Sequence, residues 1–200
     1  MRFEDTRFAC IDFETTGFSP KSSRAIELAI VDVQHGEIGD SWTSLLNPGL
    51  ECDMGAEHIH GINSNWVADA PTFSDVAGDI YERLDGSVIV AHNVSFDLGF
   101  LYAEMDRCGC LPRGLLFPNW DSRKASVYAP IKPPTRKLSD VADAFSIDIA
   151  NAHQALDDTY AVAEIIAAIT PLVEDDISFD KLFSSPGEPE PTGLFKLRPI

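Results

Sequence analysis

The sequence is poor in basic residues. Lysine and arginine number 15 against 32 aspartates and glutamates, which gives a formal net charge of −17 at pH 7. A chain this acidic repels the phosphate backbone of nucleic acids, so tight, non-specific binding along a duplex is not expected. Binding to a longer polyanion would need a local basic segment or a partner protein.

Cysteine and long apolar runs are also scarce. No apolar run approaches the roughly 20 residues needed to cross a bilayer. The four cysteines form no zinc-like pattern beyond Cys108-Gly109-Cys110, for which a redox role stays open. No leader of charged and apolar regions precedes the first expected strand. We therefore expect a cytoplasmic protein without membrane association, with Cys10 in the core of its first strand.

The composition that remains is that of a globular domain. Of the 200 residues, 44% are hydrophobic and 10% aromatic, which is enough for one domain of moderate size. We expect this domain to span residues 1–172. Residues 173–200 are acidic, turn-rich and low in apolar residues, so we expect a C-terminal extension that lies on the domain, is partly disordered or binds a partner.

Hydrophobic periodicity predicts an α/β fold. Apolar, β-branched stretches predict an antiparallel meander of three strands and then one further strand, over residues 7–11, 25–33, 38–46 and 87–91. Helical spacing predicts one helix that opens at Pro71. It predicts three more helices over residues 98–108, 138–145 and 159–169.

Two carboxylates end the first expected strand. Because side chains alternate along a strand, Asp12 and Glu14 lie on one face, where they repel each other unless a cation sits between them. Thr15, Thr16 and Gly17 follow as a turn whose N–H and hydroxyl groups suit a phosphate or a sugar. The sequence therefore predicts a divalent-cation site at this strand end.

Two more carboxylates occur in similar settings. Asp97 lies on the first turn of a helix that follows the strand at 87–91, where α/β sheets place their chemistry. Asp158 heads the apolar stripe of the last helix, whereas Asp157 points elsewhere. An unpaired carboxylate on a core stripe costs several kcal/mol, so Asp158 is expected to have a cation or strong donors.

Three motifs carry a resemblance to a known family. D-x-E-T-T-G at 12–17, H-N-x-x-F-D at 92–97 and H-x-x-x-x-D at 153–158 resemble, in order and spacing, the exonuclease motifs of the DEDDh 3′–5′ exonuclease superfamily. The resemblance covers about residues 6–172. Gln154 stands where the sister branch carries tyrosine, which indicates the histidine branch. The first motif is worded most like the proofreading (epsilon) subunit of bacterial DNA polymerase III.

The resemblance implies an RNase H-like fold: a mixed five-stranded sheet, its first three strands antiparallel, flanked by helices. It also implies two Mg²⁺ ions, for which Mn²⁺ substitutes. By this resemblance Asp12 would be a ligand of both ions, Glu14 and Asp158 would be ligands of the ion that activates water, and Asp97 would serve the second ion. His153 would take the proton from the attacking water.

The resemblance also implies residues that contact the substrate. They are Thr15, Gly17, His60, Asn93 and Phe96. For three of them a structural role stays open: His60 as a surface loop residue, Asn93 as a tie at the strand end, and Phe96 as a packing residue.

The implied activity is removal of nucleoside 5′-monophosphates from single-stranded 3′ ends, favouring DNA. An RNA or oligoribonucleotide exonuclease, a non-catalytic nucleic-acid-binding module and a hydrolase of small phosphate esters are the alternatives. Association with a DNA polymerase or another replication or repair protein, and a homodimer, stay open. A basic stretch between residues 111 and 137 is the candidate contact for upstream phosphates, or else a solvated loop; it contains Arg113, Arg123, Lys124, Lys132, Arg136 and Lys137.

Overall fold

The computed structural model describes residues 2–49, 54–55, 57–111, 114–151 and 154–173. His153, Cys52, Arg113 and nearly all of the expected C-terminal extension, residues 174–200, lie outside the described residues. Val173, the first residue of that expected extension, is buried in the hydrophobic core. No described helix has the length and apolar character that a membrane span requires.

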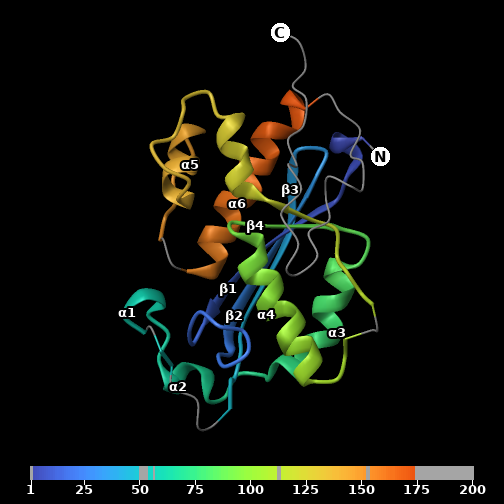
Figure 1. Ribbon diagram of the computed structural model, residues 1–200, viewed down its shortest axis with the longest axis vertical. Coiled ribbons are helices and arrows are strands. Elements are labelled where there is room, and N and C mark those ends of the chain that lie inside the picture. Colours follow the sequence, from blue (N-terminus) through green and yellow to red (C-terminus); the bar gives the residue numbers. More distant parts are fainter. Residues whose placement is uncertain (1, 50–53, 56, 112–113, 152–153, 174–200) are drawn as a thin grey trace.

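A mixed sheet forms the centre of the described part of the chain (Figure 1). Its five strands run in the order β3-β2-β1-β4-β5. β1 pairs antiparallel with β2, and β2 with β3, whereas β4 is parallel to both β1 and β5. The bounds are β1 Phe8–Thr15, β2 Ala25–Gln34, β3 Glu37–Leu45, β4 Val88–Ala91 and β5 Asn119–Asp121. The predicted α/β class, with an antiparallel meander at its start, is confirmed.

Helices cover both faces of the sheet. α3 (Phe73–Leu84) and α4 (Val94–Arg107) pack on one face, and α5 (Leu138–Ala144) and α6 (Ala155–Ile169) pack on the other. Short helices complete the described elements; they are η1 Phe3–Asp5, α1 Glu57–His60, α2 Ser64–Val67, η2 Ser122–Val127 and η3 Thr170–Leu172. β1 is the central strand, and helices cover both of its faces. Its side chains must therefore be apolar on both faces, which explains the nearly continuous hydrophobic run at the start of β1.

Alternate side chains of β1 lie on opposite faces of the sheet. Phe8 and Cys10 lie in the core beneath α5 and α6, whereas Ala9, Ile11 and Phe13 lie in the core beneath α3 and α4. The even-numbered side chains of β1 therefore face α6. Asp12 and Glu14 continue this even series toward the open end of the strand.

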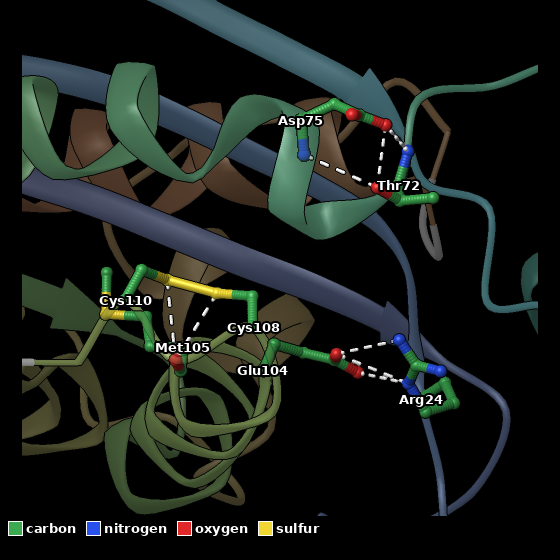
Figure 2. The surroundings of a disulfide bond; sticks show 7 residues. All are labelled: Arg24, Thr72, Asp75, Glu104, Met105, Cys108 and Cys110. Atoms are coloured by element: carbon green, nitrogen blue, oxygen red, sulfur yellow. Dashed lines mark hydrogen bonds and ion pairs between the residues drawn. A yellow bond between two sulfur atoms is a disulfide. The ribbon is translucent and has the colours of Figure 1, made fainter.

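Several helix starts differ from the sequence prediction. The helix expected to open at Pro71 begins at Phe73, because Thr72 and Asp75 form a reciprocal capping box that fixes its first turn (Figure 2). α6 begins at Ala155, one turn before the expected residue 159. The short helix α2 was not predicted; Asn63 caps it by accepting a hydrogen bond from the Asn65 N–H.

The end of α4 carries a disulfide that the sequence analysis did not predict. Cys108, the C-cap of α4, is bonded to Cys110 (Figure 2). Both sulfur atoms lie within 3.4 Å of the Met105 carbonyl oxygen, at 3.3 and 3.4 Å. Gly109 between them has a φ of +67°, a conformation that favours glycine. Cys10 is fully buried in the first strand, as expected.

Candidate active site

Three carboxylates converge where β1 ends and α6 begins. Asp12 and Glu14 reach toward α6 from the even face of β1, and Asp158 lies on the first turn of that helix. One carboxylate oxygen from each residue lies within 4.8 Å of the other two. Residues separated by more than 140 positions thus share one small acidic cluster, which we call the carboxylate cluster.

Asp97 approaches the same strand end from the other face of the sheet. It lies on the first turn of α4 and is 2% exposed. Its Oδ1 accepts a hydrogen bond of 3.2 Å from the N–H of Phe13, the residue between Asp12 and Glu14. Asp97 is thus held against β1 beside the carboxylate cluster, although it is not one of the three residues within 4.8 Å.

The site is electrostatically unfavourable without a cation. Burial raises the pKa of Asp12 well above its usual range, and the negative charges of Asp97 and Glu14 add to this effect. Burial, followed by the charge of Asp158, raises the pKa of Glu14 to about 8. Burial also raises the pKa of Asp97, an effect opposed by the hydrogen bond from Phe13.

The described salt bridges do not neutralise Asp12, Glu14 or Asp97. Within the described part of the chain, the salt bridges formed by arginine and histidine side chains involve other carboxylates. The available donors are carboxylate oxygens, the ligands that hard divalent cations prefer. The cluster therefore fits a divalent metal ion.

Glu27 is a further acidic residue at this site, and the sequence analysis missed it. It lies on β2 directly opposite Glu14 in the antiparallel register, and its charge raises the pKa of both Asp12 and Glu14. Its carboxylate also accepts a hydrogen bond from the N–H of Ala155, the first residue of α6. A glutamate inside the otherwise apolar run 25–33 was the signal that could have identified it.

That hydrogen bond acts as a helix cap supplied by the sheet. Gln154, at the N-cap position of α6, provides no side-chain cap hydrogen bond. Glu27 supplies an acceptor for one of the unpaired N–H groups of the first turn, and its negative charge suits the positive end of the helix. Glu27 thereby ties the helix turn that carries Asp158 to the strand beside Glu14.

The turn after Glu14 is closed by its own hydrogen bonds. The Thr15 hydroxyl donates to the Gly17 carbonyl oxygen at 2.8 Å. Thr16 and Arg24 exchange two bonds, from the Thr16 N–H to the Arg24 carbonyl oxygen and from the Arg24 N–H to the Thr16 hydroxyl oxygen. A Cβ on Gly17 would lie 2.7 Å from the Ser23 hydroxyl oxygen, so the Ser23 side chain would have to move to admit a larger residue there.

Arg24 is also held by a buried glutamate that the sequence analysis did not identify. Glu104 of α4 is 1% exposed, and its carboxylate accepts bonds from the Arg24 Nε at 2.9 Å and Nη2 at 3.0 Å (Figure 2). It also accepts from the Ala25 N–H at 3.0 Å and from the Arg107 Nη1 at 3.0 Å. This network fixes the start of β2 against the helix that carries Asp97.

His60 lies near this turn but is not the exposed loop histidine considered as an alternative. It is 6% exposed, and its Nδ1 accepts a 3.0 Å bond from the Ile62 N–H. Its Nε2 lies 3.2 Å from the Met54 carbonyl oxygen and therefore carries the proton. Gly55 packs against Thr16 so closely that a Cβ would lie 2.0 Å from the Thr16 carbonyl oxygen. His60 thus holds the loop that covers this turn; a contact between His60 and substrate stays a prediction.

The second motif forms the junction between β4 and α4. Asn93 adopts a left-handed conformation, with φ +83°, and precedes the helix without a side-chain cap bond. The Phe96 ring lies half-buried with its centroid 5.0 Å from that of Phe100, which is a packing contact. His92 bonds through Nδ1 to the Ser122 hydroxyl at 2.9 Å and through Nε2 to the Arg136 carbonyl oxygen at 2.7 Å. Burial is the main cause that lowers the pKa of His92.

Asp121, the last residue of β5, is held by several hydrogen bonds. Its carboxylate accepts from the Val94 N–H at 3.2 Å and from the Arg123 N–H at 2.9 Å. The Arg123 guanidinium pairs with the same carboxylate. Asp121 therefore joins the end of β5 to the first residue of α4.

Relatives of known name include large bacterial enzymes. The chain is 33% identical over 162 residues to a DNA polymerase III PolC-type from Clostridium perfringens, covering 81% of this chain and 11% of the relative. It is 38% identical over 104 residues to the 3′-5′ exonuclease DinG of Bacillus subtilis, covering 52% of this chain and 11% of the relative. It is 32% identical over 162 residues to DinG of Staphylococcus aureus, covering 80% of this chain and 18% of the relative. The chain thus spans less than a fifth of these relatives' length.

Solved structures share the fold. E. coli Exonuclease I in complex with a dT13 oligonucleotide matches with a TM-score of 0.71 and 21% identity, over 82% of this chain and 41% of that one. The cell-death related nuclease 4 (CRN-4) matches with a TM-score of 0.66 and 17% identity, over 84% and 65%. The predicted RNase H-like arrangement is confirmed. A family model described as Exonuclease, RNase_T, matches residues 9–166. The chain therefore belongs to the RNase_T exonuclease family.

Proposed function

We propose that this chain is a metal-dependent 3′–5′ exonuclease that removes nucleoside 5′-monophosphates from single-stranded 3′ ends, with DNA as the preferred substrate. The observation that carries the proposal is the carboxylate cluster of Asp12, Glu14 and Asp158, with Asp97 held against the same strand end. Carboxylates that repel one another at short range suit cation binding, and membership of the exonuclease family supports the reaction.

The proposed cofactor is a pair of Mg²⁺ ions, for which Mn²⁺ substitutes. Asp12, Glu14 and Asp158 would hold one ion, and Asp97, together with Asp12, would hold the other. When bound, such ions supply Lewis acidity and charge neutralisation for the attack of water on a phosphodiester. Glu27 keeps the first turn of α6 in place, so that Asp158 stays beside Glu14.

The remaining roles belong to side chains around this site. His153, which lies outside the described residues, would accept a proton from the attacking water, because an unperturbed imidazole titrates near neutral pH. Attack at phosphorus breaks the bond to the 3′ oxygen of the preceding nucleotide, so the product is a nucleoside 5′-monophosphate. Thr15, Gly17, His60, Asn93 and Phe96 are the proposed contacts to the terminal nucleotide.

The preference for DNA rests on the names of the relatives. They include a DNA polymerase III and a 3′-5′ exonuclease DinG, and one structural neighbour was solved with a dT13 oligonucleotide. We propose residues 1–172 as the catalytic domain, and a DNA polymerase or a repair protein as its partner. A site that reads the backbone and the 3′ hydroxyl acts on many base sequences.

The test is digestion of matched single-stranded DNA and RNA oligonucleotides labelled at the 5′ end, in Mg²⁺ and in EDTA. We expect a ladder of shortening products in Mg²⁺, faster for DNA than for RNA, and no products in EDTA. Asp12→Asn should abolish the ladder, whereas the matched change of exposed Asp40, Asp40→Asn, should not. Intact DNA and RNA oligonucleotides after incubation with the wild-type protein in Mg²⁺ would refute the proposal, and a faster RNA ladder would refute the substrate preference.

A further inference from the structure

The segment from residue 111 to 137 has a charge opposite to that of the rest of the chain. It contains six of the 15 basic residues and a single acidic residue, Asp121. Asp121 is already paired with Arg123. Lys132, Arg136 and Lys137 are exposed, and within the described part of the chain they form no salt bridge. A local positive surface thus stands on a protein with a net charge of −17.

A surface pocket of about 520 Å³ lies within this segment. Lys132 and Arg136 line it together with Ser126, Val127 and Thr135. Val127 is 54% exposed, and Ile131, next to Lys132, is 72% exposed. The pocket therefore offers cationic and hydroxyl groups beside exposed apolar surface, a combination that suits the phosphates and the sugars or bases of a nucleic-acid strand.

The loop that forms the pocket is anchored by hydrogen bonds. The Thr135 hydroxyl donates to the Asp140 carboxylate and accepts a 3.1 Å bond from the Lys137 N–H. Because these bonds fix the backbone around Arg136, less conformational entropy would be lost when a ligand binds there. A preformed pocket is the usual form of a binding site.

The pocket is also joined to the strand end that carries the catalytic motif. His92 follows β4 directly, and its ring bridges Ser122 and the Arg136 carbonyl oxygen. Asp97 lies five residues later, on the first turn of α4. One imidazole thus links the pocket wall to the element that holds Asp97. In Figure 1 the loop before α5 and the start of α6 lie on the same side of the sheet.

We propose that this pocket binds the phosphodiester backbone of single-stranded nucleic acid, upstream of the 3′ end that enters the carboxylate cluster. Lys132 and Arg136 pair with phosphates, and Val127 and Ile131 contact sugars or bases. The inference rests on the proposed exonuclease function, and it explains how an acidic protein holds a polyanion. A partner protein at the same surface is the competing occupant.

The test compares two substrates with the double variant Lys132→Glu/Arg136→Glu. A 20-nucleotide single strand reaches the pocket, whereas the p-nitrophenyl ester of thymidine 5′-monophosphate reaches only the cluster. The ratio of kcat/KM for the strand to kcat/KM for the ester should fall by about tenfold or more, mainly through KM. The salt dependence of strand binding should weaken by about one to two units of log–log slope, because two phosphate contacts are lost. The charge-conserving variant Lys132→Arg/Arg136→Lys should keep both the kcat/KM ratio and the salt dependence near those of the wild type.

The control variant is Arg2→Glu, which reverses one exposed cation at the far N-terminus, and it should leave the ratio near that of the wild type. An unchanged ratio in the double variant, or an equal loss on both substrates, overturns the proposal; the former favours the partner protein. If the wild type cleaves neither substrate, the exonuclease function itself fails. In that case fluorescence anisotropy with the labelled strand still decides whether the double variant loses binding.

Discussion

Glu14→Gln should stabilise the metal-free protein at alkaline pH, although it removes a member of the carboxylate cluster. The carboxylate of Glu14 lies among other negative groups, and burial raises its pKa from 4.5 to about 8. A carboxyl group with a raised pKa contributes stability below its unfolded pKa, and this contribution is lost as the pH rises through its folded pKa. Above pH 8 the ionised Glu14 therefore lowers the free energy of unfolding, whereas glutamine stays neutral.

The size of the effect follows from the shift. A pKa change from 4.5 to about 8 corresponds to a ceiling of about 5 kcal/mol. Glu14 is half-buried, and its partly solvated charge is screened, so we expect about 1–2 kcal/mol at pH 9. For a protein of this size, that change corresponds to a rise in Tm of about 2–8 °C.

The assay is thermal unfolding by circular dichroism at pH 5 and pH 9, in EDTA and in 10 mM Mg²⁺. In EDTA the Tm of Glu14→Gln should exceed that of the wild type at pH 9 and match it at pH 5. Mg²⁺ should raise the Tm of the wild type more than that of the variant, because binding to the folded state stabilises it. Glu82→Gln, on the exposed face of α3, is the matched control and should show neither effect.

Two results would contradict this reasoning. One is a lower Tm for Glu14→Gln than for the wild type in EDTA at pH 9, which would mean that Glu14 contributes more through its contacts than it costs through its charge. The other is an equal Mg²⁺-induced rise in Tm in both proteins, which would show that Glu14 does not bind the metal ion.

Three other variants test separate parts of the site. Glu104→Ala should lower the free energy of unfolding by about 3 kcal/mol in urea titrations, because the Arg24 side chain and the Ala25 N–H lose a buried acceptor. Glu27→Ala should lower kcat more than Glu27→Gln, since glutamine retains an oxygen for the Ala155 N–H; steady-state kinetics measures both. His153→Ala should lower kcat by about 10²–10⁴-fold without changing the Tm, as removal of a general base does.

Each of these predictions has an outcome that contradicts it. Glu104→Ala with the urea midpoint of the wild type would show that the network contributes no stability. Equal kcat values for Glu27→Ala and Glu27→Gln would show that the hydrogen bond from the Ala155 N–H to residue 27 does not contribute to activity. Full activity of His153→Ala across the pH range would assign the proton transfer to another group.

Local patterns predicted most of the fold. The apolar runs around Cys10 and Val90 identified two strands that are neighbours in the sheet. The motif that ends at Asp97 correctly marked the start of a helix directly after the second of these strands. The family match confirmed the resemblance to exonucleases. The three motifs could be recognised because each consists of residues close together in the sequence. Helix starts were less accurate, since a cap such as the Thr72–Asp75 box depends on side-chain hydrogen bonds rather than on periodicity.

The residues missed by the sequence analysis are those whose partners are distant. Glu104 bonds to Arg24 across 80 positions, and neither residue belongs to a recognisable motif. Glu27 lies opposite Glu14 only in one register of the β1–β2 pair, and a shift by one residue would move it to the other face. Charged residues within apolar runs are therefore the signal to examine first in related sequences.

The span of the carboxylate cluster has a consequence for biosynthesis. Its members come from the first strand and the last long helix, at Asp12 and Asp158, so the chain must be synthesised almost to the end of the domain before all of them coexist. A nascent chain or a fragment that lacks α6 cannot assemble the cluster. Under the proposed function, nuclease activity would therefore begin only after α6 has been made.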